Sequence, residues 1–228
     1  GDYASRCFID AYHTDTGKRL WRFYTIPGEG ERNVESWSGD SYKIGGGGTW
    51  MNGSFDPDLN LIYWGVGNPY PDHDGDARKG DNLYTDCVVA LDAQTGELRW
   101  HYQFTPHDVW DYDGVNEMVL IDLMLEGRKV KALLHADRNG HFYALDRQSG
   151  KLIYAKPFVR VTWTKGFNAS GRPLVSPDAI PNVEGATVCP GAAGGKEWNA
   201  MAFSPITQMI YLPVIENCAV FLNNGVKA

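Results

Sequence analysis

Short apolar runs that end in a polar turn recur along the chain and predict β-strands. Residues 87–91 and 142–145 are two such runs, and an aspartate follows each of them directly. Apolar runs of about four to eight residues bounded by turn residues are typical of buried strands, whereas a helix needs a longer stretch with helical periodicity. The sequence shows no amphipathic helix longer than two turns, so we predict an all-β chain.

A turn motif occurs three times and gives the chain its repeat. The shared pattern is A-x-(D/H)-x-x-(T/S)-G-x-x-x-(W/Y), and it occupies residues 11–21, 90–100 and 144–154. The Asp at the third position can accept hydrogen bonds from backbone amides of the turn, and Gly supplies the positive φ that a tight turn needs. The motif predicts three β-hairpins, each with a large aromatic at the end of its second strand that packs against a neighbouring sheet.

The spacing of the repeats leaves room for long loops. The motif glycines Gly17, Gly96 and Gly150 are 79 and 54 residues apart. A propeller blade takes roughly 40–50 residues, so we expect the excess in loops, where binding sites are commonly located. Residues 165–200 are rich in Gly, Pro, Ala and Asn and are expected to form a long excursion.

The composition argues against several classes of protein. The 228 residues contain 21 Lys and Arg against 28 Asp and Glu, which gives a formal net charge of −7 and disfavours a nucleic-acid-binding protein. No apolar run approaches the roughly 18 residues of a membrane-spanning helix. Four Cys without a C-x-x-C pair predict neither a disulfide scaffold nor a zinc knuckle. The 8 Trp, 12 Tyr and 26 Gly fit short packed strands and tight turns.

Two acidic residues stand out in the polar segment 105–117. Asp111 and Asp113 are two positions apart, and in an extended segment their side chains would lie on the same side. Two neighbouring carboxylates repel each other unless they share a proton or bind a cation, and a hard cation is the natural partner of oxygen ligands. The alternative, which the spacing alone favours, is a solvated acidic turn.

Three other segments carry side chains suited to a bound ring or ion. Four glycines at 45–48 precede Thr49 and Trp50, so the backbone can approach a flat ligand and the indole offers a stacking face. Asn68 follows a strand and a G-x-G turn, and Arg138 lies in an Asn-Gly hairpin turn where it could bind a carboxylate. The ordinary alternatives are a flexible loop beside a core Trp, a turn Asn and a solvated Arg.

These motifs occur together in one known enzyme family. The chain contains A-x-D-x-x-T-G-x-x-x-W, G-G-G-x-T-W, W-G-x-G-N-P, P-H-D-x-W-D-Y-D-G and D-R-N-G. Over essentially its whole length it resembles the pyrroloquinoline quinone (PQQ) dependent alcohol dehydrogenases of the methanol and ethanol dehydrogenase type. The resemblance implies an eight-bladed β-propeller with quinone and metal on its axis. We therefore expect an all-β partial propeller of about three to four blades, with residues 1–228 as a fragment of a single quinoprotein propeller domain.

The resemblance implies a set of residues that bind the cofactor. Trp50 matches the indole that forms the floor under the quinone ring, and Thr49 belongs to the same loop. Arg138 matches the basic residue beside the reactive quinone carbonyls and is expected to take part in catalysis. The family also places an Asn near the quinone, and Glu197 or Asn199 could serve in its place.

The resemblance also implies a metal site made by Asp2, Asn68, Asp111 and Asp113. Asp111 matches the catalytic aspartate that takes the alcohol proton, and Asp2 falls where the family normally has a longer Glu. Asp113 matches the extra carboxylate of the lanthanide-dependent members, whereas calcium-dependent members usually carry a small uncharged residue there. A trivalent ion of calcium-like size attracts one more anionic oxygen than a divalent ion does. The expected metal is therefore a lanthanide ion or Ca²⁺.

The four cysteines divide into one pair and two single thiols. The positions of Cys189 and Cys218 match a disulfide of the family, and such a bond would suit the periplasm. Closing a loop of about 30 residues stabilises a fold by roughly 3–4 kcal/mol in the chain-entropy model. Cys7 and Cys87 are expected to be buried free thiols.

The function implied by the resemblance is oxidation of a primary alcohol to an aldehyde. Hydride would pass to the metal-bound quinone, and electrons would then leave to a cytochrome c. A small alcohol and cytochrome c are the expected partners, without nucleic acid or a membrane span, in the periplasm; a homodimer of the full-length protein is compatible with this. Two alternatives stay open: a non-catalytic β-propeller that binds a partner, and a calcium-dependent quinoprotein of another substrate range in which Asp113 is merely solvated.

Overall fold

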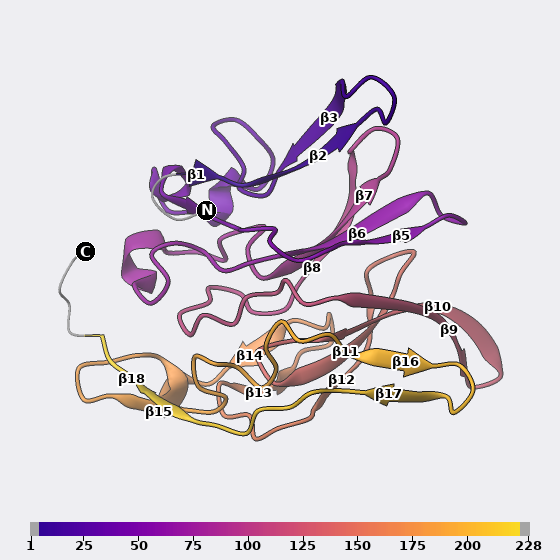
Figure 1. Ribbon diagram of the computed structural model, residues 1–228. Coiled ribbons are helices and arrows are strands. Elements are labelled where there is room, and N and C mark those ends of the chain that lie inside the picture. Colours follow the sequence, from indigo (N-terminus) through magenta and orange to yellow (C-terminus); the bar gives the residue numbers. More distant parts are fainter. Residues whose placement is uncertain (1–4, 224–228) are drawn as a thin grey trace.

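Two four-stranded antiparallel sheets form the centre of the computed structural model, which describes residues 5–223 (Figure 1). The first sheet has the order β5–β6–β7–β8 and the second has the order β12–β11–β10–β9. No α-helix occurs among the described residues, which confirms the all-β prediction. The strands are β5 Ser54–Asp56, β6 Leu61–Val66, β7 Cys87–Asp92, β8 Leu98–Gln103, β9 Met118–Leu125, β10 Arg128–Ala136, β11 His141–Asp146 and β12 Leu152–Pro157.

A two-stranded hairpin packs on the outer side of each central sheet. β2 (Phe8–Tyr12) pairs with β3 (Arg19–Tyr24), and β16 (Ala202–Ser204) pairs with β17 (Met209–Tyr211). One apolar cluster joins the first hairpin to β6 and β7, and another joins the segment of the second hairpin to β10 and β11. The chain thus forms two complete propeller blades and parts of two more, in agreement with the expected three to four.

The remaining elements are short and lie in the connections. The predicted excursion at 165–200 contains small paired strands, and none of the helical turns within residues 5–223 is long and apolar enough to cross a membrane. The paired strands are β1 Ser5–Arg6 with β4 Gly45–Gly46, β13 Thr164–Phe167 with β14 Pro173–Val175, and β15 Ala186–Val188 with β18 Ala219–Phe221. The 3-10 helices are η1 Val34–Ser36, η2 Ser41–Lys43, η3 Gly75–Arg78 and η4 Pro177–Ala179.

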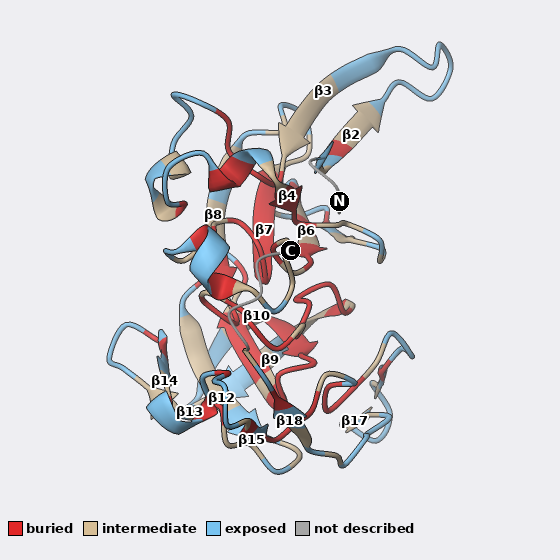
Figure 2. Ribbon diagram, turned by 90° about the vertical axis from the view of Figure 1, so that its left-hand side faces the viewer, coloured by how far each residue is buried: buried red, intermediate tan, exposed pale blue. Residues whose placement is uncertain are grey.

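Strand β7 shows why the sheets stack. Its side chains alternate between two apolar layers, because successive residues of a strand point to opposite faces. Val88 and Ala90 pack toward the second sheet, whereas Val89 and Leu91 pack toward the hairpin β2–β3. All four are fully buried, and burying a Val or Leu side chain contributes about 1.5–3 kcal/mol. Figure 2 shows the buried residues concentrated in these central strands.

Each tryptophan of the repeated motif docks on the turn of the following sheet. The Trp21 indole N–H donates to a backbone carbonyl of the β7–β8 turn at 3.1 Å, and the Trp100 indole does the same in the β11–β12 turn at 3.3 Å. A Cβ on Gly96 would lie 2.6 Å from the Trp21 ring, and one on Gly150 would lie 2.5 Å from the Trp100 ring. The predicted packing of the motif aromatic between sheets is therefore confirmed for these two residues.

The polar residue of the motif organises the turn itself. Asp92 Oδ1 accepts two backbone N–H bonds of 3.0 Å each, and Asp146 Oδ1 accepts two of 2.9 Å. In the first repeat, His13 Nδ1 accepts one backbone N–H at 3.2 Å. The three turns thus use the same local geometry with either side chain.

Candidate cofactor and metal site

One edge of the two central sheets gathers the polar loops. In an antiparallel sheet the start of β5 and the ends of β6 and β8 lie at the same edge. The loops at these points carry Trp50, Asn68 and the segment 105–117, and the β10–β11 turn at the corresponding edge of the second sheet carries Arg138. The fold therefore brings together loops that are up to about 90 residues apart in the sequence.

Arg138 lies among three carboxylates. Its Nη1 is 3.3 Å from Asp113 Oδ2, and its Nη2 is 3.5 Å from both Asp111 Oδ2 and Glu197 Oε1. Nη2 also donates a hydrogen bond to the backbone carbonyl of Ala192. Because Arg138 is only 7% exposed, the alternative of a solvated turn arginine is wrong.

Asp113 is buried and bonded to the loop of Asn68. Its Oδ1 accepts the Asn68 backbone N–H at 3.0 Å, and a Cβ on Gly67 would lie 2.2 Å from that same oxygen. The Asn68 side-chain NH₂ donates to Asp72 Oδ1 at 2.9 Å, so the amide oxygen is the atom that it can offer to a cation. Burial raises the pKa of Asp113 to about 6, against the opposing effect of Arg138. A merely solvated Asp113 is not what the structure shows.

The backbone at Asp111 and Asp113 differs from the expected extended form. Both residues have left-handed backbone, with φ of 66° and 45°. The loop is held by Asp108, whose two carboxylate oxygens accept the backbone N–H groups on either side of Asp111 at 2.9 and 2.8 Å. The extended geometry was a wrong prediction, yet both carboxylates still reach Arg138. Burial raises the pKa of Asp111 to about 7, again opposed by Arg138.

The glycine-rich loop lies directly against the loop of Asn68. Gly47 and Gly48 each form a backbone hydrogen bond of 2.8 Å with residues 67–68. Trp50, two residues further, is 51% exposed, so much of its indole surface is open. The Thr49 hydroxyl donates to a backbone carbonyl of β2 at 3.2 Å.

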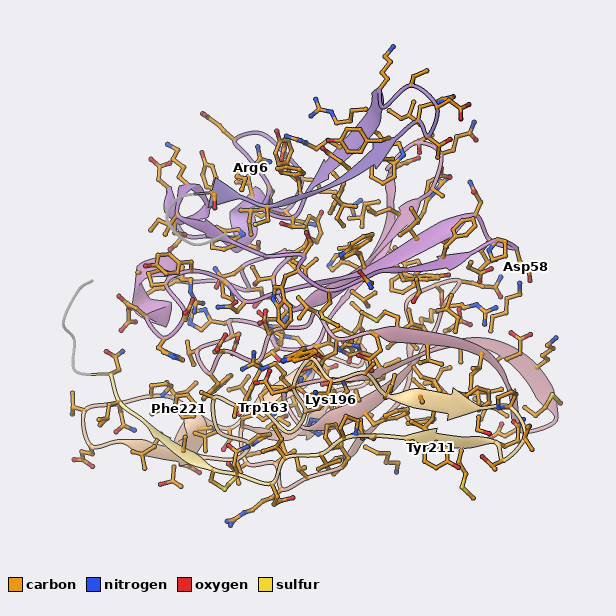
Figure 3. The ribbon with its side chains drawn as sticks, viewed as in Figure 1. Arg6, Asp58, Trp163, Lys196, Tyr211 and Phe221 are labelled. Atoms are coloured by element: carbon orange, nitrogen blue, oxygen red, sulfur yellow. A yellow bond between two sulfur atoms is a disulfide. The ribbon has the colours of Figure 1, made fainter. Side chains whose placement is uncertain are left out.

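A buried ion pair holds the segment that carries Glu197. Lys196 is fully buried, and its Nζ is 3.1 Å from Glu117 Oε2 and 3.1 Å from the carbonyl oxygen of Glu197 (Figure 3). Of the two alternatives for the residue near the quinone, Glu197 contacts Arg138, whereas Asn199 is exposed.

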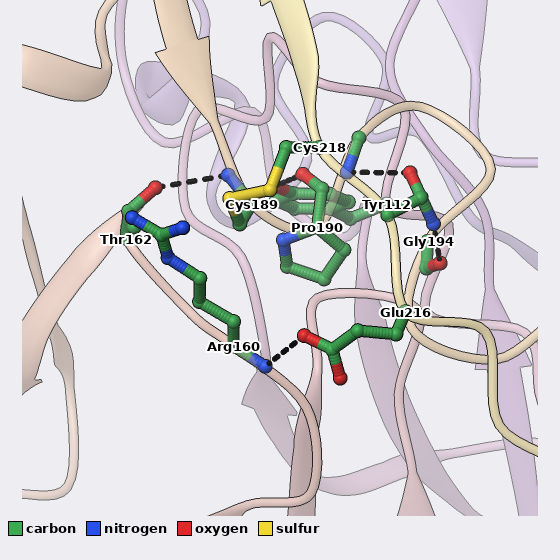
Figure 4. The surroundings of a disulfide bond; sticks show 10 residues. Tyr112, Arg160, Thr162, Cys189, Pro190, Gly194, Glu216 and Cys218 are labelled. Carbon is green, nitrogen blue, oxygen red and sulfur yellow. Dashed lines mark hydrogen bonds between the residues drawn. A yellow bond between two sulfur atoms is a disulfide. The ribbon is translucent and has the colours of Figure 1, made fainter.

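The disulfide closes a loop around the same segment, and this loop is hydrogen-bonded to the acidic segment. Cys189 and Cys218 are bonded, as expected, and enclose the segment that contains Glu197 (Figure 4). Tyr112 lies between Asp111 and Asp113 in the sequence, and its hydroxyl donates to the carbonyl of Pro190 at 2.7 Å. The covalent loop is thereby anchored beside the candidate site.

Cys7 and Cys87 are free thiols, as predicted. Cys87 is buried, and burial raises its pKa well above the ordinary range. Cys7 is only partly buried, so the expectation of a buried thiol was wrong for this residue. It lies between β2 and the two-residue strand β1, where little of the sheet covers its side chain.

The candidate metal ligands within the described residues are Asn68, Asp111 and Asp113. Asp2 lies outside residues 5–223. Within that range no group of three or more His, Cys, Asp and Glu side chains is arranged to hold a metal ion. Two carboxylates and an amide are nevertheless oxygen donors of the type that hard cations favour. The Gly67 backbone, too close to Asp113 to accept a side chain, fits a tightly built oxygen site.

Sequence reasoning missed three buried charged residues around this site, Arg78, Asp86 and Asp108. Arg78 bonds mainly to backbone carbonyls, and such contacts leave no side-chain motif in a sequence. Asp108 lies within the motif P-H-D-x-W-D-Y-D-G, but the sequence does not show that its carboxylate binds the amides of the loop. Asp86 is fully buried, and neither carboxylate oxygen has a hydrogen-bond partner among the described atoms. Burial first, and then the nearby Asp108 and Asp113, raise the pKa of Asp86 well above its usual value.

Comparison with known proteins finds relatives along almost the whole chain. Residues 3–164 match the PQQ family described as "Glucose/ethanol/alcohol dehydrogenase, beta-propeller domain". Quinohemoprotein alcohol dehydrogenase ADH IIB of Pseudomonas putida is 41% identical over 98% of this chain and 34% of its own length. The lanthanide-dependent methanol dehydrogenase of Methylacidiphilum fumariolicum is 38% identical over 100% of this chain and 40% of its own length.

Solved structures agree with the sequence relatives. A europium-containing methanol dehydrogenase has a TM-score of 0.87 at 38% identity, over 93% of this chain and 41% of its own. The quinohemoprotein alcohol dehydrogenase from Comamonas testosteroni has a TM-score of 0.89 at 38% identity, over 95% and 34% respectively. The chain spans about a third to two fifths of the length of the curated relatives that it matches. It belongs to the PQQ family of glucose, ethanol and other alcohol dehydrogenases, through their β-propeller domain.

Proposed function

We propose that the full-length protein oxidises a primary alcohol to an aldehyde with PQQ and a bound cation, preferentially a lanthanide. The observation that carries this proposal is the buried contact of Arg138 with Asp111 and Asp113, beside Asn68. Residues 1–228 would be a fragment of a single quinoprotein propeller domain. Relatives named as alcohol and methanol dehydrogenases support the substrate class.

The side chains of the site divide the work of alcohol oxidation. When bound, the quinone with its ion would supply the acceptor for the hydride of the alcohol carbon, which carries the two electrons of the oxidation. Asp111 accepts the hydroxyl proton, and a pKa of about 7 in the ion-free fold shows how strongly its buried position favours the protonated form. Arg138 stabilises negative charge that develops during the reaction. The open indole of Trp50 supports the ring by stacking, with Thr49 and Glu197, or Asn199, as further cofactor-binding residues.

The cation would be held by Asn68, Asp111 and Asp113, together with Asp2. Asp113 adds a buried carboxylate beside the partly buried Asp111, and the repulsion between the two acids is offset most strongly by an ion of high charge. Similarity to proteins named as lanthanide-dependent and europium-containing methanol dehydrogenases supports a lanthanide over Ca²⁺.

The proposal extends to the compartment and the electron acceptor. The Cys189–Cys218 bond supports an oxidising compartment, and we propose the periplasm. We also propose cytochrome c as the acceptor of the electrons, in line with the family resemblance. A homodimer of the full-length protein is compatible with these assignments.

The test is dye-linked alcohol oxidation by the full-length protein, reconstituted with PQQ and either lanthanum or calcium. We expect higher turnover with lanthanum, and loss of that preference in Asp113→Ala. Asp58→Ala is the matched control, because Asp58 is an exposed carboxylate paired with a lysine on the blade surface. Equal activity with either ion and no loss in Asp113→Ala would exclude the lanthanide assignment. Absence of PQQ uptake, measured by absorbance, would favour the non-catalytic binding module.

A further inference from the structure

Arg78 is a fully buried arginine that the proposed mechanism does not use. It is the last residue of η3 and is among the largest fully buried side chains of the described residues. Burying a guanidinium costs free energy unless its N–H donors are hydrogen-bonded. The acceptors around Arg78 must therefore offset that cost.

The guanidinium of Arg78 bonds to four acceptors from three segments. Nε donates to the carbonyl of Pro71 at 2.8 Å, and Nη2 donates to the carbonyls of Asp72, at 2.7 Å, and Asp108. Nη1 donates to Asn82 Oδ1 at 2.9 Å, and the Asn82 amide returns a bond to the Arg78 carbonyl at 2.7 Å. A planar fork with five N–H donors suits this arrangement, whereas a lysine ammonium presents three donors from one point.

Two of these acceptors lead directly to the candidate site. Asp72 accepts the Asn68 side-chain NH₂ through its carboxylate, while its carbonyl accepts Arg78. Asp108 accepts the N–H groups on both sides of Asp111 through its carboxylate, while its carbonyl accepts the same guanidinium. Arg78 therefore connects the two loops that carry the candidate ligands, at one remove from each.

The charge of Arg78 adds to this geometric role. Burial lowers the pKa of Arg78, and the nearby Asp108, Asp86 and Asp72 oppose this by favouring its charged form. Asp86 and Asp108 are fully buried, so a cation in their midst offsets repulsion between acids on adjoining loops. A neutral side chain in place of Arg78 would remove both the hydrogen bonds that connect the two loops and the positive charge that offsets the repulsion between their acids.

We propose that Arg78 is a positioning residue for the ion site, which sets the separation of Asn68 and Asp111 by bridging the carbonyls of Asp72 and Asp108. The inference rests on the proposed function, because it concerns the same ion. Loss of a group bonded directly to a metal ligand typically weakens metal binding by about 10–100-fold. Arg78 holds Asp72 and Asp108 one step further out, so we expect a change at the lower end of that range when the fork geometry is lost.

The experiment compares the full-length protein with its Arg78→Lys, Arg78→Met and Arg147→Lys variants. Arg147 is the matched control, because it is a second buried arginine, 7% exposed against 0% for Arg78. Its guanidinium bonds to two carboxylates and a backbone carbonyl beside the docking turn, away from the candidate site. Europium affinity is measured by luminescence titration, and the thermal midpoint of each protein is recorded without the ion. Arg78→Lys and Arg147→Lys are both expected to lower the midpoint, but only the Arg78 variants should weaken europium binding, by at least about tenfold.

The outcomes separate this inference from the proposed function. If the unaltered protein binds europium and Arg78→Lys binds it equally well, Arg78 has no positioning role and the ion site stands. If the unaltered protein binds no europium, the ion site and the inference both fail. If Arg78→Lys binds europium more weakly but reaches full PQQ uptake at high europium concentration, the positioning role is supported. If Arg147→Lys loses as much europium affinity as Arg78→Lys, the effect is general destabilisation and the positioning role is contradicted.

Discussion

The two opposite edges of the central sheets, the docking edge with the motif turns and the site edge with the candidate site, are held together by different interactions. At the docking edge, turns of the repeated motif receive Trp21 and Trp100, and Asp92 bonds to amides two and three residues ahead. At the site edge, Arg138 collects carboxylates from loops that are far apart in the sequence. The docking edge uses local bonds and apolar contact, whereas the site edge buries charge that only the assembled fold can balance.

The difference between the two edges separates residues that stabilise the fold from residues expected to act in binding and catalysis. A change at the docking edge should unfold the protein without altering the chemistry of the folded fraction. A change at the site edge should alter binding or turnover with a smaller effect on folding.

The largest expected effect is loss of the proton acceptor at the site edge. Asp111→Asn should lower kcat about 10³-fold, equivalent to about 4 kcal/mol, because the amide cannot take the hydroxyl proton. Dye-linked alcohol oxidation of the reconstituted full-length protein measures this loss. Asp92→Asn makes the same chemical change at the docking edge and should keep nearly full kcat. Retention of a tenth or more of the activity in Asp111→Asn would rule out its role as general base.

The next effect distinguishes two tryptophans. Trp100→Ala should lower the free energy of unfolding by about 3 kcal/mol, because the ring fills the space over Gly150 between two blades. Trp50→Ala, at a half-exposed position, should change that free energy by less than about 1 kcal/mol and weaken PQQ binding instead. Urea unfolding and PQQ titration measure the two quantities. Equal losses of stability would remove the distinction between the two edges.

The third effect concerns pH and a histidine at the start of β11. Burial lowers the pKa of His141 from the usual 6.5 to about 4, because the imidazolium is poorly solvated there. The unfolded chain therefore binds a proton first as the pH falls, so this contribution to stability is complete above about pH 6.5 and is lost toward pH 4. The loss amounts to roughly 2–3 kcal/mol. In His141→Gln, unfolding free energies measured between pH 7 and pH 4 should fall less steeply; an unchanged slope would contradict the assignment.

The smallest effect is expected at an exposed ion pair of the docking edge. Arg99 Nη2 lies 3.0 Å from Asp92 Oδ2, but the Arg99 side chain is 49% exposed. Arg99→Ala should leave the free energy of unfolding nearly unchanged, and high salt should abolish any difference from the unaltered protein. A loss of stability as large as that of Trp100→Ala, measured by urea unfolding at two salt concentrations, would show that charge matters as much at this edge as at the site.

The docking edge could be predicted from the sequence because its determinants are local. The hydrogen bonds of Asp92 and Asp146 span two or three residues, and the same motif letters recur in each repeat. The strand ends at 92 and 146 follow directly from these turns. The pairing of β9 with β10 lies outside the repeated motif, so the local turn signals of the motif do not predict it.

The site edge could be predicted only in part. Family motifs identified Asp111, Asp113 and Arg138, but the left-handed backbone at the two acids does not follow from their spacing. The choice between Glu197 and Asn199 depends on Lys196 reaching Glu117, a contact across 79 residues. Arg78 has no motif, because its partners are mainly carbonyl groups, which every residue possesses.

The guanidinium of Arg138 has a consequence for how an ion would enter. Asp111 and Asp113 already share a counter-charge that belongs to the chain. If they hold the ion as proposed, an arriving metal would have to compete with an internal monovalent group and not only with water. Such competition penalises weakly charged ions most, because the attraction to the two acids grows with the charge of the newcomer. An internal competing charge of this kind would make the proposed site select metal ions by valence before their ionic radius matters.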